Sequence, residues 1–300
     1  MIAFLAPGQG SQTPGMLAEW LELPGAAEQI SRWSQISGLD LAALGTTATA
    51  EQITDTAVTQ PLVVATTLLA YSELARRGLP GKTLVAGHSV GEIAAYAIAG
   101  VISADDAVKL AAVRGAEMAK ACASEATGMS AVLGGEESEV LARLEALELI
   151  PANRNAAGQI VAAGAVAALE KLAEDPPAKA RVRQLATAGA FHTHYMASAL
   201  DGYAAAAAAV VASDPTTTLL SNFDGAPVAS ASEAMEKLVA QLTRPVRWDL
   251  CTETMAQQGT TAIVEFPPAG ALTGIAKREL RGVATHAVKT PADLDGLPEL

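Results

Sequence analysis

The sequence predicts an α/β fold, in which a large domain with a mainly parallel sheet carries an inserted ferredoxin-like subdomain. Short apolar runs of β type alternate with helical patterns through most of the chain, which is typical of a sheet covered by helices. Within residues 128–188 the order changes to β-α-β-β-α-β, the ferredoxin-like split unit. Hydrophobic residues make up 50% of the 300-residue chain, so it can bury a full core.

The large domain is expected to contain five strands and two well-delimited helices. A helix over residues 61–77 ends before Gly78, because glycine readily takes the left-handed conformation that follows a helix. A second helix, residues 104–121, follows Ser103, a favoured N-cap residue. The predicted strands are the apolar runs 2–5, 83–86, 218–221, 261–266 and 285–288.

The small subdomain is predicted to leave the large domain after the second helix and to return before Met196. We place residues 1–124 and 197–300 in the large domain and residues 125–196 in the small one. The predicted strands of the subdomain are 129–133, 152–155, 159–163 and 181–186, and its predicted helices are 136–147 and 165–174.

The composition argues against several classes of protein. The formal net charge is −12, whereas nucleic-acid-binding proteins carry basic surfaces. No stretch of about 20 residues is apolar and uncharged, so we expect no transmembrane helix, and the N-terminus lacks the basic segment of a secretory leader. Two widely separated cysteines, Cys122 and Cys251, suit a reduced compartment. We therefore expect a cytoplasmic monomer without nucleic-acid or membrane partners.

The strongest chemical signal is the pentapeptide Gly-His-Ser-Val-Gly at residues 87–91. It lies between a predicted strand and a predicted helix over residues 92–99, the context of a nucleophile elbow. Ser89 would then lie at a helix N-terminus, where the dipole and free N–H groups favour an oxyanion. The N–H of Val90 is the natural first donor of an oxyanion hole. The alternative is an ordinary turn of small residues between a strand and a helix.

A serine hydroxyl needs a base, and the chain has four histidines. His88 lies inside the pentapeptide and should point away from the serine, and His286 lies in a predicted strand. His192 follows the bulky Phe191 and is the better candidate to face a pocket. His194 begins a helix, where a solvated or capping role is more common.

No acid stands out as a third member of a catalytic triad. A histidine can also be oriented by a backbone carbonyl that accepts a hydrogen bond from its other ring nitrogen. We therefore expect a Ser–His dyad. The acids that follow in the chain are Asp201, Asp224 and Asp249.

Arg114 is the most informative charged residue. On a helical wheel of about 100° per residue, it lies at the centre of the apolar stripe of the helix over residues 104–121. An arginine in that position must find an anion or suffer a large desolvation cost. It either forms an internal salt bridge or binds a substrate carboxylate through two parallel hydrogen bonds. The sequence leaves both readings open.

A glycine-rich turn at residues 6–13 follows the first predicted strand. A dinucleotide-binding fingerprint would need a glycine where the chain has Thr13, and Pro7 disrupts the usual entry into the helix. We therefore expect no dinucleotide cofactor here. A loop beside the elbow can instead present a backbone N–H, here that of Gln9, as the second oxyanion donor.

Several short motifs then occur together in a consistent order. They are PGQGSQ at 7–12, TQP at 59–61, GHSVGE at 87–92, RG at 114–115, NxxGQIV at 155–161, GAFH at 189–192, PVRW at 245–248 and LTG at 272–274. Over nearly its whole length the chain therefore resembles the malonyl-CoA:acyl carrier protein transacylases of type II fatty-acid synthesis, and in particular their actinobacterial-type members. In that family a hydrolase-like large domain is paired with a ferredoxin-like small one.

The resemblance implies a role for each of the residues singled out above. Ser89 would carry the acyl group and His192 would act as the general base. Arg114 would bind the malonyl carboxylate, and the N–H groups of Gln9 and Val90 would hold the oxyanion.

Further positions match the family with less defined roles. Gln60 and Asn155 correspond to pocket-lining positions, and Phe191 resembles the malonyl-selective form of related polyketide acyltransferases. Arg247 is a departure, because many members have glutamine there. That position is expected to hold the histidine through its backbone carbonyl, so the change should be tolerated.

The resemblance implies transfer of a malonyl group from malonyl-CoA to the phosphopantetheine thiol of holo acyl carrier protein, without a metal or bound cofactor. Alternatives are service to a polyketide synthase or malonate decarboxylase carrier, a serine thioesterase, and a non-catalytic acyl-binding subunit. Carrier proteins are usually acidic, so a local basic patch should dock them despite the net negative charge, unless these are ordinary solvated clusters. The candidates are Lys179, Arg181 and Arg183, or Lys277, Arg278 and Arg281.

Overall fold

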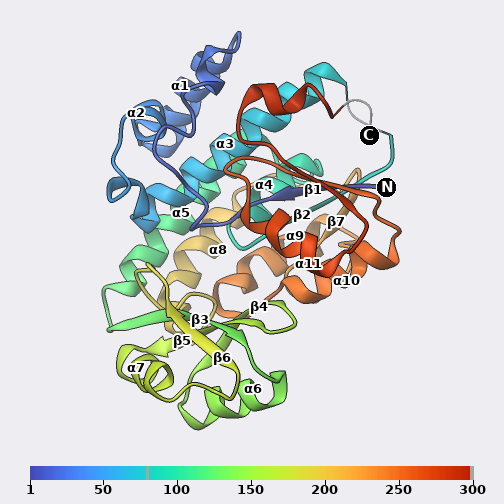
Figure 1. Ribbon diagram of the computed structural model, residues 1–300. Coiled ribbons are helices and arrows are strands. Elements are labelled where there is room, and N and C mark those ends of the chain that lie inside the picture. Colours follow the sequence, from blue (N-terminus) through green and yellow to red (C-terminus); the bar gives the residue numbers. More distant parts are fainter. Residues whose placement is uncertain (79–80, 298–300) are drawn as a thin grey trace.

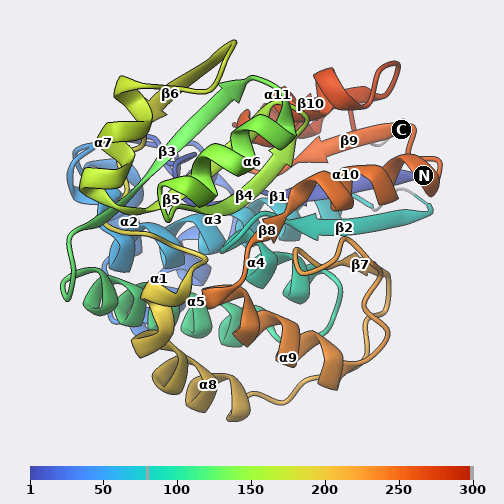
Figure 2. The same cartoon turned by 90° about the horizontal axis from the view of Figure 1, so that it is seen from below.

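Two five-stranded sheets organise the computed structural model, which describes residues 1–78 and 81–297 (Figures 1 and 2). The first sheet has the order β10-β9-β1-β2-β7 and all its pairings are parallel. Each of its strands overlaps one of the five predicted runs. The strands are β1 (Ile2–Ala6), β2 (Thr83–Gly87), β7 (Thr218–Leu220), β9 (Ala262–Glu265) and β10 (Ala284–Ala287).

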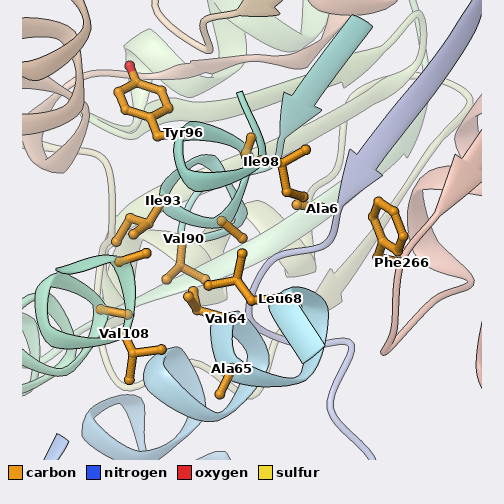
Figure 3. Close-up of a cluster of buried hydrophobic side chains, with 14 of the residues drawn as sticks. Ala6, Val64, Ala65, Leu68, Val90, Ile93, Tyr96, Ile98, Val108 and Phe266 are labelled. Carbon is orange, nitrogen blue, oxygen red and sulfur yellow. The ribbon is translucent and has the colours of Figure 1, made fainter. Parts of the chain in front are cut away.

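Both faces of the parallel sheet are buried under helices. Along β1, the even-numbered residues such as Phe4 pack in one hydrophobic cluster with α3 (Thr56–Arg77), α4 (Gly91–Ile98) and α5 (Ala104–Cys122). The odd-numbered Leu5 packs in another cluster with α10 (Trp248–Gln257) and α11 (Ala271–Glu279). Because strand side chains alternate between faces, burial on both sides explains why these strands read as continuous apolar runs. Figure 3 shows the first cluster, with Val90 among side chains of α3, α4 and α5.

The second sheet confirms the predicted ferredoxin-like order. Its strands run β6-β3-β5-β4-β8, and the pairings among the first four are antiparallel. The helices α6 and α7 cover one face and share a small hydrophobic cluster with it, on the side away from the parallel sheet (Figure 1). The elements are β3 (Thr127–Gly134), α6 (Glu137–Ala146), β4 (Ile150–Ala156), β5 (Gln159–Ala165), α7 (Val166–Glu174) and β6 (Ala180–Gln184).

The fifth strand of this sheet was not predicted. β8 (Val246–Arg247) comes from the C-terminal part of the chain and pairs in parallel with β4, through Asn153 and Arg154. Two residues are too short a run to produce a period of apolar residues, which is why the pattern alone missed it. The pairing joins the two parts of the molecule beside the site described below. The exact domain boundaries given above stay a prediction.

One predicted helix began too late. α3 begins at Thr56, with the side chain of Asp55 accepting the N–H of Ala57 as an N-cap, so Pro61 lies inside the helix. Proline is favoured in the first turn of a helix, and Pro61 lies in the second turn of this one. The predicted ends at Gly78 and the N-cap at Ser103 are confirmed.

The remaining helices complete the cover of the parallel sheet and its surroundings. None of the helices in residues 1–78 and 81–297 is both long and apolar enough to pass through a bilayer. These helices are α1 (Ala26–Ser37), α2 (Leu41–Thr46), α8 (Leu200–Ala208), α9 (Ala231–Ala240), α10 (Trp248–Gln257) and α11 (Ala271–Glu279), with 3-10 turns at Trp20–Glu22, Gln52–Thr54, His194–Ala199, Gln241–Thr243 and Pro291–Leu294.

Candidate active site

The turn between β2 and α4 has the geometry of a nucleophile elbow. Ser89 has φ +54°, a left-handed conformation that costs a non-glycine residue free energy. A Cβ atom on Gly87 would lie 2.1 Å from the carbonyl of Gly91, and one on Gly91 would lie 2.2 Å from the carbonyl oxygen of Ala6. Only glycine fits at both positions. The turn therefore presents the hydroxyl of Ser89 at the carboxyl end of a central strand.

His192, the predicted base, contacts the serine directly. Its Nε2 lies 2.7 Å from Ser89 Oγ. Its Nδ1 donates to the backbone carbonyl of Gln241 at 2.8 Å, which leaves the lone pair of Nε2 facing the serine hydroxyl. His192 also has a left-handed backbone, with φ +60°. The pair is a dyad oriented by a carbonyl.

The identity of that carbonyl corrects one expectation. Arg247 was expected to hold the histidine, but the acceptor is Gln241. The guanidinium of Arg247 is instead bound to the carboxylate of Asp249, and its N–H donates to the carbonyl of Asn222. Arg247 thus fixes the start of α10 and the short strand β8.

The environment keeps the imidazole neutral. Burial, and next the positive charge of Arg114, lower the pKa of His192 to about 3. A histidine with this pKa is unprotonated at neutral pH and can accept the serine proton without first losing one.

The guanidinium of Arg114 lies beside the dyad and is 1% exposed. Its Nη1 donates to Oε1 of Gln60 at 2.8 Å, its Nη2 donates to Oε1 of Gln241 at 2.8 Å, and Nη2 also lies 3.5 Å from Ser89 Oγ. Among the described residues no carboxylate forms a salt bridge with it, so the internal ion pair considered above is absent. A buried cation with only amide and hydroxyl partners can bind an anion that enters the cavity.

Of the two predicted oxyanion donors, Val90 follows the serine in the chain and Gln9 lines the same cavity as Ser89. Val90 is the residue before α4, and its side chain is fully buried in the core (Figure 3). Gln9 lies in the loop after β1, where its side chain donates to the hydroxyl of Thr56 at 3.2 Å. In the part of the chain that the structure describes, neither backbone N–H donates a hydrogen bond. Both N–H groups therefore stay available for an acceptor.

A cavity of about 820 Å³ opens between the two sheets above Ser89. Gln60, Asn155 and Phe191 line it, as predicted. Asn155 comes from the small sheet and accepts a hydrogen bond at 2.8 Å from Nε2 of His88, whose ring lies against Trp248. This contact bridges the two parts of the molecule at the cavity wall. The volume suits a substrate with a long arm and a small acyl group.

Other candidates from the sequence take no part in the dyad. His194 is exposed, and His286 lies in β10. The carboxylate of Asp224 pairs with Lys237. Of the basic residues considered for docking, Arg278 lines the cavity. The docking role of both basic clusters stays a prediction.

Sequence reasoning missed three polar residues beneath the elbow. Asn222 accepts the N–H of Ser89 at 2.8 Å and donates to the carbonyl of Gly87 at 2.7 Å. Gln241 contacts both His192 and Arg114. Glu92 is fully buried, and its carboxylate accepts from the backbone N–H of Asn222 and the side-chain amide of Gln241. A weak signal existed for Asn222, because polar residues at the carboxyl ends of parallel strands commonly form sites. Gln241 acts on the base through its backbone, which leaves no pattern of residue types.

Comparisons with known proteins place the chain in a family. The family model described as acyl transferase domain matches residues 3–292. A malonyl CoA-acyl carrier protein transacylase of Mycolicibacterium smegmatis is 78% identical over 290 residues, which cover 95% of this chain and 100% of the relative. The crystal structure of the corresponding protein from Mycobacterium tuberculosis is 73% identical and covers 99% of both chains, with a TM-score of 0.97.

A more distant solved structure is also informative. It is a malonyl-transacylase in complex with its type II PKS acyl-carrier protein, 30% identical to this chain. It covers 99% of both chains with a TM-score of 0.94. The two-sheet architecture is therefore retained at low sequence identity.

Proposed function

Because the chain belongs to the malonyl CoA-acyl carrier protein transacylase family, we propose that it transfers a malonyl group from malonyl-CoA to the phosphopantetheine thiol of an acyl carrier protein for fatty-acid biosynthesis. One observation supports this choice above the others. A buried guanidinium, for which residues 1–78 and 81–297 offer no carboxylate partner, lies 3.5 Å from the hydroxyl of a Ser–His dyad. A small acyl group that ends in a carboxylate satisfies both features at once.

The first half-reaction forms a malonyl ester on Ser89. His192 Nε2 takes the hydroxyl proton while Oγ attacks the thioester carbonyl. The N–H groups of Gln9 and Val90 hold the oxyanion of the tetrahedral intermediate. The intermediate collapses, the C–S bond breaks, and the departing CoA thiolate takes the proton from His192.

The second half-reaction reverses these steps with a different thiol. The phosphopantetheine thiol of the carrier gives its proton to His192 and attacks the ester carbonyl. Ser89 Oγ leaves and recovers the proton, and the malonyl group is now a thioester on the carrier. Serine, imidazole, backbone N–H groups and guanidinium supply every step, so we propose that no metal or bound cofactor is needed.

Arg114 makes the carboxylate part of recognition. An acetyl group lacks that carboxylate and leaves the guanidinium without its anion, so acetyl-CoA should be a poor donor. A thioesterase would have to admit water to the ester. The carbonyl-oriented dyad does not decide between water and thiol, so measured hydrolysis in the absence of carrier is the test of that alternative. Transfer to a polyketide carrier is the second candidate, because a relative is solved with one.

The proposed function is tested by intact mass after mixing the protein with malonyl-CoA. We expect a malonyl adduct on the wild type and none on Ser89→Ala. Arg114→Ala should form the malonyl ester at least about 100-fold more slowly, because a desolvated charge-assisted pair is lost, while acetylation slows far less. An unmodified wild type, or an adduct that persists in Ser89→Ala, would contradict the proposal.

Two further expectations belong with this proposal. We propose that the enzyme works as a monomer in the cytoplasm. Both cysteines are free thiols, which suits a reduced compartment. Light scattering at micromolar concentration tests the oligomeric state, and a stable dimer would contradict it.

A further inference from the structure

Glu92 is a buried carboxylate that the mechanism above does not use. It lies in the first turn of α4, three residues after Ser89, and is 0% exposed. In the part of the chain that is described, no lysine, arginine or histidine forms a salt bridge with it. A buried carboxylate is costly unless its hydrogen bonds serve a purpose. Its contacts therefore need an explanation.

Both oxygens of Glu92 accept hydrogen bonds from groups that touch the site. Oε1 accepts from the backbone N–H of Asn222 at 2.6 Å, and Oε2 accepts from the side-chain amide of Gln241. Asn222 in turn accepts the N–H of Ser89. Gln241 contacts Arg114 through its side chain and His192 through its backbone. One residue thus separates the carboxylate from each of Ser89, His192 and Arg114.

The chemistry of the two groups determines which way the amide of Gln241 faces. An ionised carboxylate only accepts hydrogen bonds, so the NH₂ of Gln241 must face Glu92. The same NH₂ is also directed at the carbonyl of Ser89, at 3.2 Å. Oε1 of Gln241 must then face the opposite way, where it accepts from Nη2 of Arg114 at 2.8 Å. The opposite orientation would place NH₂ against a guanidinium, donor against donor.

We propose that Glu92 is a positioning residue for substrate selectivity: by accepting from the amide of Gln241, it holds that side chain with its oxygen towards Arg114 and so fixes the guanidinium where the malonyl carboxylate binds. This inference rests on the proposed function. It goes beyond it, because Glu92 touches neither substrate nor reacting atoms and reaches Arg114 through Gln241.

The variant Glu92→Gln separates positioning from chemistry. The new side chain has one acceptor and one donor end. The backbone N–H of Asn222 cannot turn round, so the acceptor end stays with it and the donor end faces Gln241. The amide of Gln241 must then flip or move, and Nη2 of Arg114 loses its acceptor at Gln241, while Nη1 keeps Gln60. The backbone carbonyl of Gln241 is not affected by this flip, so the Ser89–His192 dyad keeps its orientation.

The expected result is a selective loss. Initial rates of Ser89 acylation are measured by intact mass with malonyl-CoA and with acetyl-CoA. For Glu92→Gln the ratio of the two values of kcat/KM should fall about 10- to 100-fold, the range for losing one hydrogen bond to a charged group. Most of the change should appear in KM for malonyl-CoA. The value for acetyl-CoA should change less than about threefold.

Glu73→Gln is the matched control. Glu73 is also a buried carboxylate, 7% exposed. It pairs with Arg76 and Arg77 at the C-terminal end of α3, far from the active site. It lies 13 residues from Gln60 along that helix, about 20 Å away at 1.5 Å per residue. Its loss should lower the melting temperature and leave the malonyl-to-acetyl ratio unchanged. A merely structural role for Glu92 would give the same pattern as this control.

An exchange variant keeps the test valid if Glu92→Gln is unstable. In Glu92→Gln/Gln241→Glu the amide at position 92 donates to the carboxylate at position 241, which again offers an oxygen to Arg114. The total charge is unchanged, and we expect at least a fivefold recovery of the malonyl-to-acetyl ratio relative to the single variant. No recovery, or a ratio in Glu92→Gln within twofold of the wild type, would overturn the positioning role. A wild type without any malonyl adduct would instead overturn the proposed function.

Discussion

The two sheets serve the same cavity in different ways. The parallel sheet is buried on both faces and provides the chemistry at the carboxyl ends of its strands, with Ser89 after β2 and Asn222 shortly after β7. The antiparallel sheet is covered by α6 and α7 on one face. Its other face packs partly in the main core, through Met129, Ala152 and Ala163, and partly provides cavity wall, including Val161 and Asn155. The parallel sheet holds Ser89 in a strained turn, and the antiparallel sheet shapes the space above it.

This difference has a physical origin. The reacting groups need left-handed backbones and buried polar atoms, and such features persist only where the surrounding structure over-determines them. A sheet packed on both faces meets that requirement. A cavity wall needs only side chains of suitable size and polarity, which a sheet face that partly borders the cavity provides. Substitutions of equal size should therefore lower activity and stability much more in the parallel sheet than in the antiparallel sheet.

The largest difference is expected from a single added methyl group. In Gly91→Ala the new Cβ would meet the backbone of β1 at 2.2 Å, and neither partner can rotate away. The elbow cannot close in its present form, so Ser89 acylation should fall at least about 1,000-fold, the scale for losing an oriented nucleophile. The rate of malonyl adduct formation measures it.

Gly128→Ala is the matched change in the antiparallel sheet. Gly128 lies in β3, and its added Cβ would have an ordinary contact with Leu169 at 3.4 Å. Its activity should stay within about twofold of the wild type, as for a substitution without strain. If both variants lost activity equally, the contrast between the sheets would be wrong.

The elements that the sequence predicted correctly are those with local causes. The elbow was found because a strained turn requires glycine on both sides of Ser89, and Arg114 because a helical wheel shows one charge in an apolar stripe. The order of the small sheet followed from its alternation of strands and helices. Each of these patterns consists of particular residue types at a fixed spacing, so it can be recognised in the sequence alone.

What was missed depends on contacts across the chain. Gln241 holds His192 through a backbone carbonyl, which any residue type could supply, so the expectation placed it at Arg247. The strand β8 is only two residues long and forms because β4 offers it an edge. Glu92 was visible in the GHSVGE motif but had no assigned role, because its partners at 222 and 241 are more than 100 residues away.

Stability should show the same contrast on a smaller scale. Val85 in β2 is fully buried, whereas Val161 in β5 is buried to 7% exposure and also lines the cavity. Val85→Ala should lower the free energy of unfolding by about 2–3 kcal/mol, because both the transfer of methyl groups and a new void contribute. Val161→Ala should cost about 1 kcal/mol, since space beside it is already open. Denaturant titration measures both, and equal losses would count against the contrast.

The smallest effect on activity is expected from a change of pH. It tests whether solvent is excluded from His192. Because burial and Arg114 lower the pKa of His192 to about 3, the imidazole stays unprotonated from pH 8 to pH 5.5. The kcat/KM of Ser89 acylation should therefore change less than about twofold across that range. A base with the ordinary pKa of about 6.5 would be about 9% unprotonated at pH 5.5, a tenfold loss.

Acetyl-CoA is the suitable donor for this measurement. Burial raises the pKa of Glu92 to about 7, so recognition of malonyl-CoA through Gln241 and Arg114 changes in the same pH range, whereas acetyl-CoA reports the base alone. The linked stability has a definite sign. Below about pH 6.5 the unfolded chain binds a proton at His192 that the folded chain refuses until about pH 3, so this residue makes the fold less stable as pH falls through that window. A tenfold loss of acetyl transfer at pH 5.5 would show that solvent reaches the dyad. The packing around the parallel sheet would then not exclude water from Ser89 and His192.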